Sequence, residues 1–172
     1  MIIIDLLAIV VAVYTGVFLI QANRQTEFHS KLNPSGQFTN DIADAEQLIR
    51  IGNKLMDEDK YEEAIYHYNR ALELDSTFVG VLVDRGSCYY VLHEYDKALS
   101  DFTAALALQP DHSIAHFNAG IVYGALGNDS MMVSYWEKYL ELEPEGELAD
   151  RIRQFLSKHK NAKREKDKAT TE

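Results

Sequence analysis

Apolar positions between residues 45 and 146 recur with the spacing of amphipathic helices, and the whole pattern returns at intervals of 34 residues. Each interval holds a glycine in its first half and an aromatic residue in its second half. The glycines are Gly52, Gly86 and Gly120, and the aromatic residues are Tyr68, Phe102 and Trp136. A fixed period of this length is typical of stacked helix pairs. We therefore predict an all-α fold with three units, 45–78, 79–112 and 113–146.

Small residues in these units predict close contact between the two helices of a pair. The glycines lack a side chain, so the paired helix can come close, and the aromatic residues are expected to fill the space between one unit and the next. Ala64 and Ala98 match one period apart, whereas the third unit has Met132 there and Tyr139 in place of a second alanine. We expect the second helix of the third unit to pack at a changed angle or distance.

A further helix is predicted at 147–158. One of its faces is apolar and contains Leu148, Ile152, Phe155 and Leu156. Such a helix can cap the apolar side that the last unit would otherwise expose. Residues 159–172 are basic and poor in apolar side chains, so we expect a disordered tail, which either keeps the end soluble or contacts anionic lipid headgroups.

Residues 2–20 are mainly apolar and carry a single charge, on Asp5. A helix of that length rises roughly 28 Å, close to the thickness of the hydrocarbon core of a bilayer. We therefore predict a transmembrane anchor at 1–22, and a cleaved signal peptide is the alternative. Arg24 and Lys31 follow the segment and favour repeats on the cytoplasmic side, whereas cleavage would favour the periplasm.

One face of the predicted anchor carries small residues at a spacing of four. Small residues at this spacing allow two membrane helices to approach each other closely. The proposed packing face contains Asp5, Ala8, Ala12, Thr15 and Gly16. The stretch 23–44 is expected to be a linker, with Asp44 and Gln47 forming a capping box that opens a helix at Ala45.

The glycine, aromatic, alanine and proline positions together resemble the tetratricopeptide repeat (TPR) family, with the closest fit at 79–112. The resemblance implies a right-handed superhelix whose concave groove is lined by the first helix of each pair. It places eight residues in that groove: Ile49, Asn53, Met56, Val83, Ser87, Tyr90, Phe117 and Ile121. Some family members hold the acidic C-terminus of a chaperone with lysine and arginine. Ile49, Ile114 and Asn118 stand at those positions here, so we expect no such binding.

Charge and candidate chemistry exclude several classes of function. The net charge of −10 argues against nucleic acid as the main partner, and the single cysteine, Cys88, cannot form an intramolecular disulfide. His112 and His116 are four residues apart, but no third ligand lies nearby in the sequence. We find no phosphate loop or nucleophile motif, and we predict neither enzymatic activity, nor a cofactor, nor a metal site.

These observations favour a membrane-anchored adaptor that binds a protein partner through an apolar groove and helps to assemble or stabilise a membrane complex. The alternative is a permanent accessory subunit held mainly by its transmembrane helix. Within the first interpretation, the groove either binds another protein or is filled by the linker of the chain itself.

Overall fold

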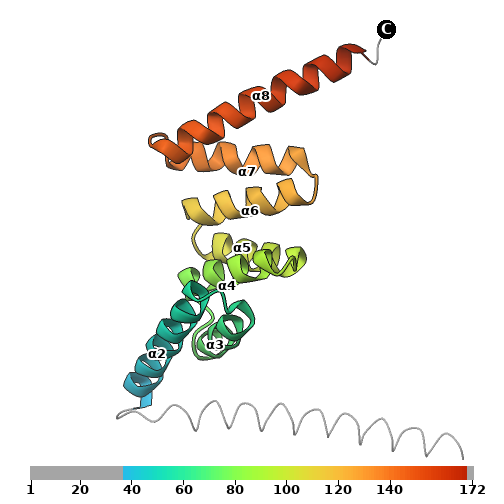
Figure 1. The fold of residues 1–172 in the computed structure, drawn as a ribbon. Helices are drawn as coiled ribbons and strands as arrows, with labels where there is room; N and C mark the ends of the chain where they lie inside the picture. Colours follow the sequence, from blue (N-terminus) through green and yellow to red (C-terminus); the bar gives the residue numbers. More distant parts are fainter. Residues whose placement is uncertain (1–36, 170–172) are drawn as a thin grey trace, which may run out of the picture. The chain divides into compact units, whose positions relative to one another are not determined.

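The computed structural model describes residues 37–169, with side chains from 43 to 162. This part of the chain contains seven α-helices and no β-strand (Figure 1). The helices are α2 (Gln37–Asp57), α3 (Tyr61–Leu74), α4 (Val79–Val91), α5 (Tyr95–Leu108), α6 (Ser113–Ala125), α7 (Asp129–Leu142) and α8 (Glu147–Ala169). Within the compact unit Ala45–Glu172, the helices from α3 to α8 follow one another in chain order as a stack. The prediction of an all-α solenoid of helix pairs is confirmed.

Two helix ends differ from the sequence prediction. Because α2 already begins at Gln37, Asp44 lies inside a helix and does not cap its start. No proline or glycine separates Gln37 from Ala45, so nothing in the sequence breaks the helix there. The helix α8 runs to Ala169, past the predicted end at 158, because lysine, arginine, glutamate and alanine favour helix even without an apolar face.

Each pair is closed by the same tight turn. The residues at its centre, Asp59, His93 and Gly127, lie 34 positions apart and all have positive φ, at 58°, 60° and 71°. After each of them, a backbone N–H returns to a carbonyl five residues earlier, for example from Glu94 to Tyr89 at 2.8 Å. This is the hydrogen bond of a Schellman cap, which satisfies a carbonyl at the helix end. Only one of the three turns uses glycine for the left-handed conformation.

The glycine and the aromatic residue of one unit lie against each other. A Cβ atom built on Gly86 would lie 2.7 Å from Cε1 of Phe102, and one on Gly52 would lie 2.6 Å from Cε1 of Tyr68. On Gly120 it would overlap the indole ring of Trp136. The ring therefore occupies the volume that any side chain at the glycine would need.

The third unit accommodates its larger second helix by a change in the first. On the first helix, the third unit has Gly124 at the position of Met56 and Tyr90 in the other units. On the second helix, it has Met132 at the position where the other units have alanine. The sulfur of Met132 lies 3.0 Å from the position of a Cβ on Gly124. The large and the small residue have thus exchanged helices, which keeps the volume between the helices filled.

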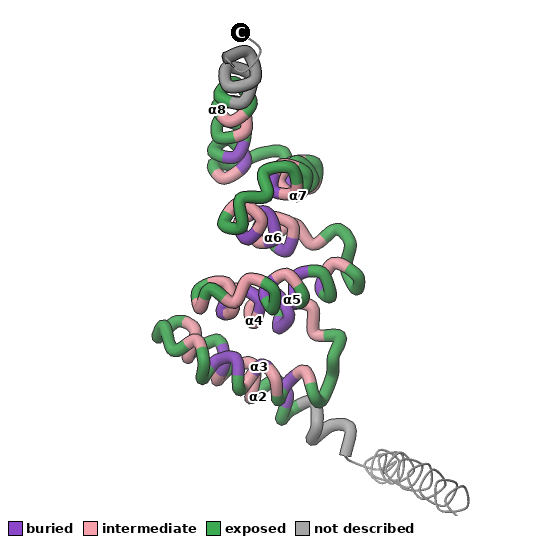
Figure 2. The backbone as a smooth tube through the Cα atoms, turned by 90° about the vertical axis from the view of Figure 1, so that its right-hand side faces the viewer, coloured by how far each residue is buried: buried purple, intermediate pink, exposed green. Residues whose placement is uncertain are grey.

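Most of the described core lies between successive helices of the stack, and the buried positions fall on the inner sides of the helices (Figure 2). Phe102 packs within one cluster that includes Ala115, Ala119 and Val122 of the next unit. Tyr68 packs in the same way against Val81 and Cys88. The expectation that these aromatic residues fill the space between units is therefore confirmed for the first two units.

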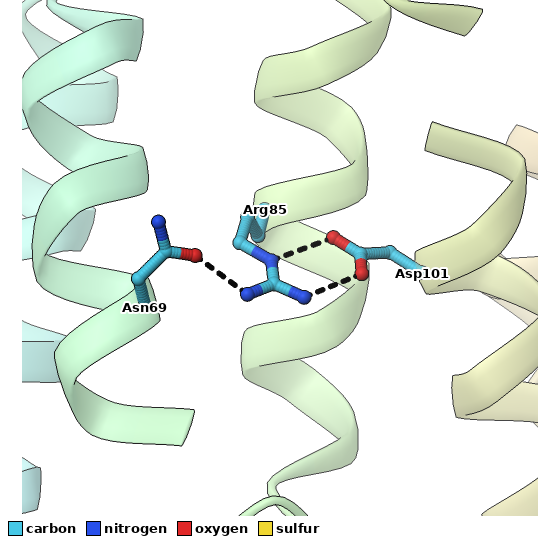
Figure 3. Close-up of polar contacts among 3 residues, drawn as sticks. All are labelled: Asn69, Arg85 and Asp101. Carbon is cyan, nitrogen blue, oxygen red and sulfur yellow. Dashed lines mark hydrogen bonds and ion pairs between the residues drawn. The ribbon is translucent and has the colours of Figure 1, made fainter. Parts of the chain in front are cut away.

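An ion pair between half-buried Arg85 and buried Asp101 connects three helices of the stack (Figure 3). The guanidinium of Arg85 on α4 donates to both carboxylate oxygens of Asp101 on α5, at 2.7 and 2.6 Å. A third nitrogen donates to Oδ1 of Asn69 on α3 at 2.6 Å. The bonds to Asp101 raise the pKa of Arg85, with burial acting against them. The network joins the first unit to the second through directional contacts.

The predicted location as a single-pass membrane protein is wrong for residues 37–169. No helix among residues 37–169 is both long and apolar enough to cross a membrane. The segment on which the prediction rested, residues 2–20, lies outside the described residues, as does its packing face Asp5, Ala8, Ala12, Thr15 and Gly16.

We predict that Gly86→Ala lowers the free energy of unfolding by roughly 1–3 kcal/mol, because the new methyl group must displace the ring of Phe102. Adding Phe102→Leu should recover part of that loss. Gly80→Ala is the matched control on the same helix, since a Cβ there meets nothing within 4 Å. Urea unfolding followed by circular dichroism gives the values, and equal values for the two glycine variants would contradict the contact.

We also predict that Asp101→Leu costs about 1–3 kcal/mol of stability, because it leaves the half-buried guanidinium of Arg85 without its carboxylate. The double variant Arg85→Leu with Asp101→Leu should be more stable than Asp101→Leu alone, because the unpaired charge is gone. Chemical denaturation of both variants measures this difference. If the double variant were less stable than Asp101→Leu, the unpaired charge of Arg85 would not be the cause of the destabilisation in the single variant.

Candidate functional site

The first helices of the second and third units lie closer together than the second helices of these units. The backbones of α4 and α6 approach within 8 Å, whereas those of α5 and α7 do not. In this part of the described chain the first helices therefore lie on the inner side of the curve. The residues expected in the groove belong to these helices, and we call the surface that they form the first-helix face.

In the first unit, the expected groove residues surround the hydroxyl of a buried tyrosine. The hydroxyl of Tyr68 donates to Oδ1 of Asn53 at 2.8 Å and lies 3.8 Å from the sulfur of Met56. Asn53 is exposed, while Met56 and Ile49 are half-buried. This end of the face offers apolar surface with one amide.

In the second unit, Val83 differs from the expectation. Its side chain is only 5 % exposed and packs in the core, so it is unavailable to a partner. Ser87 and Tyr90 are half-buried. The hydroxyl of Ser87 donates to the carbonyl of Val83 at 2.8 Å and accepts from the amide of Asn118 at 3.1 Å, which ties α4 to α6.

In the third unit, Phe117 and Ile121 are half-buried on α6. The ring of Phe117 is stacked on that of Trp136 with centroids 6.3 Å apart, and its centroid lies 5.6 Å from that of the Tyr139 ring. Tyr139, which stands where the other units have alanine, thus forms an aromatic cluster with Phe117 and Trp136.

The middle of the first-helix face carries a carboxyl group and no cation. Burial raises the pKa of Asp84, and the charge of nearby His112 acts against this shift. Burial, followed by the charge of Asp84, also raises the pKa of Cys88 to about 12, so this thiol is not a nucleophile at neutral pH. Ile114 is exposed on the same helix as Asn118, and neither side chain carries a charge.

A cleft that the sequence analysis missed lies at the end of the face. It has a volume of about 410 Å³ and lies between α8 and the last pair. Its apolar walls are Phe117, Trp136, Leu148, Ile152 and Phe155, and its polar residues are Arg151, Gln154 and Lys158. We call it the terminal cleft.

The signal for this cleft was present in the sequence. Arg151 lies one period after Phe117, and Phe155 lies one period after Ile121. In this register α8 corresponds to a first helix, but its backbone comes within 8 Å of that of α7 and not of that of α6. Its side chains meet Phe117 of the face at the terminal cleft. Its buried contacts come from Ala149 and Ile152, whereas Phe155, expected on the buried face, is 46 % exposed.

The two histidines considered as metal ligands are engaged in helix contacts. Nδ1 of His112 accepts from the backbone N–H of Ala115 at 3.2 Å and caps α6. Nε2 of His116 donates to the carbonyl of Pro110 at 2.9 Å. Among the residues that the structure describes, no group of three histidine, cysteine, aspartate or glutamate side chains is placed to hold a metal ion.

The comparisons with known proteins agree with this architecture. Models of the tetratricopeptide repeat match residues 45–78 and 79–112, the first two predicted units. The solved first TPR domain of human RPAP3 is 30 % identical, with a TM-score of 0.60 over 69 % of this chain and 96 % of that one. The chain therefore belongs to the tetratricopeptide repeat family, a family of protein-interaction modules.

Two further relatives bear on function. The first TPR domain of Spaghetti (RPAP3), solved with the HSP90 peptide SRMEEVD, is 29 % identical, with a TM-score of 0.61 over 67 % of this chain and 94 % of that one. The small glutamine-rich tetratricopeptide repeat-containing protein of Dictyostelium discoideum is 31 % identical over 60 % of this chain. The match spans only 31 % of that relative, so the similarity concerns the repeats rather than the whole protein.

Proposed function

We propose that this protein is an adaptor that binds a segment of another protein along the first-helix face, in the assembly or stabilisation of a complex. The observation that carries the proposal is the row of half-buried or exposed apolar side chains on successive first helices. Its members are Ile49, Met56, Tyr90, Ile114, Phe117 and Ile121. An apolar row interrupted by a few amide and hydroxyl groups suits an amphipathic segment.

The similar RPAP3 domain accepts an acidic peptide, but the equivalent positions of this chain favour a different ligand. Ile49, Ile114 and Asn118 stand where cations would be needed, and the amide of Asn118 already donates to Ser87. The half-buried carboxyl of Asp84 adds a charge of the wrong sign to the middle of the face. We infer that the middle of the face binds apolar side chains and does not hold a terminal carboxylate.

Two exposed apolar residues allow a matched test. Ile114 lies on α6 and is 45 % exposed, while Leu108 lies at the end of α5 and is 48 % exposed. Replacing either with serine should leave the core intact, because both side chains are largely outside it. Only Ile114 belongs to the first-helix face.

We predict that Ile114→Ser weakens partner binding about ten-fold, because a buried isoleucine side chain contributes roughly 1.5–3 kcal/mol. Leu108→Ser should bind as the wild type does. Quantitative mass spectrometry after affinity purification from native extracts would identify the partner, and titration with the purified partner would give the affinities. Equal loss in both variants, or loss in neither, would place the binding surface elsewhere.

A further inference from the structure

We propose that the terminal cleft binds a peptide segment that presents one large apolar side chain between glutamate or aspartate residues. The proposal rests on the proposed function, since it specifies what one end of the first-helix face recognises. It concerns residues of α8, outside the positions at which the RPAP3-like domains would need their cations.

The apolar walls of the cleft offer ring and aliphatic surface and no free donor. The indole N–H of Trp136 already donates to the carbonyl of Phe117 at 3.1 Å, so the indole presents only its apolar atoms. The ring of Phe155 meets Trp136 edge-on with centroids 5.3 Å apart. The volume of about 410 Å³ lies within the roughly 300–1,000 Å³ of ligand pockets and admits a large apolar side chain.

The charges beside the cleft decide which apolar ligand fits. Several aromatic rings together could also hold a cation by cation–π attraction. However, Arg151 and Lys158 are exposed side chains that line this cleft, and no carboxylate is present among the lining residues. A cationic ligand would be repelled, whereas carboxylates on either side of an apolar residue would be attracted.

These two cations are available to a ligand. Among the side chains that the structure describes, neither Arg151 nor Lys158 forms an ion pair, whereas Arg153 on the same helix pairs with Asp150 at 2.8 Å. The chain as a whole carries a net charge of −10. Its overall field should therefore favour a basic peptide, and preference for an acidic one would report the local charge of the cleft.

Trp136 provides a direct signal, because it is the only tryptophan of the chain and lies in the wall of the cleft. The probes are short peptides with a central phenylalanine flanked on each side by two glutamates or by two lysines. A third peptide has alanine at the centre of the glutamate sequence. Tryptophan emission of the full chain is recorded during titration with each peptide.

We expect the glutamate–phenylalanine peptide to change the emission of Trp136 and to bind at least ten-fold more tightly than the other two. Arg151→Glu with Lys158→Glu should lose that affinity and reverse the preference towards the lysine peptide. Lys160→Glu is the matched control, an exposed lysine of α8 that does not line the cleft, and it should stay within about two-fold of the wild type. Equal affinity for the acidic and basic peptides, no binding, or no effect of the double charge reversal would overturn the proposal.

The same titration separates this inference from the proposed function. Ile114 does not line the cleft, so the Ile114→Ser variant should bind the glutamate–phenylalanine peptide as the wild type does. If that variant loses its protein partner while the charge-reversed variant keeps both the partner and the peptide, the cleft proposal fails and the first-helix face stands. If the peptide binds at Trp136 but Ile114→Ser keeps every partner, the cleft stands and the proposed use of the face fails.

Discussion

The contact between a glycine of the first helix and an aromatic ring of the second is the constraint on which the rest of the structure depends. Glycine inside a helix costs about 1 kcal/mol relative to alanine, so it needs a compensating contact. Here the ring occupies the position of the missing side chain in all three pairs. Because the ring also packs against the next unit in the first two pairs, one contact fixes both the spacing within a pair and the stacking between pairs.

The same contact links the fold to the candidate site. In the third pair, the ring over Gly120 belongs to Trp136, which reaches past the pair and forms a wall of the terminal cleft. No second helix follows α8 in the described chain, so its residue equivalent to the glycine, Gln154, has no ring to accommodate. The end of the stack therefore leaves open a space that another pair would fill, and Arg151 and Lys158 give it a positive charge.

The sequence predicted the features that repeat, because three copies of a pattern exclude chance. It indicated the pairs, their boundaries and the glycine–aromatic positions, and the resemblance to the family predicted a groove on the first helices. The sequence did not predict contacts between two residues that occur in only one of the units. The pair Arg85 and Asp101 and the exchange of size between Gly124 and Met132 each involve a single unit. Val83 was expected in the groove, but its position in the repeat did not reveal that its side chain is buried in the core.

The central claim is tested most directly by nuclear Overhauser effects in solution. The account predicts cross-peaks between the Hα atoms of Gly52, Gly86 and Gly120 and ring protons of Tyr68, Phe102 and Trp136, respectively. Gly80, which has no neighbour within 4 Å of a built Cβ, should show no cross-peak to a ring. Absence of the three cross-peaks in a folded, fully helical chain would show that the rings do not fill these positions, and the account of the fold and of its binding face would fail.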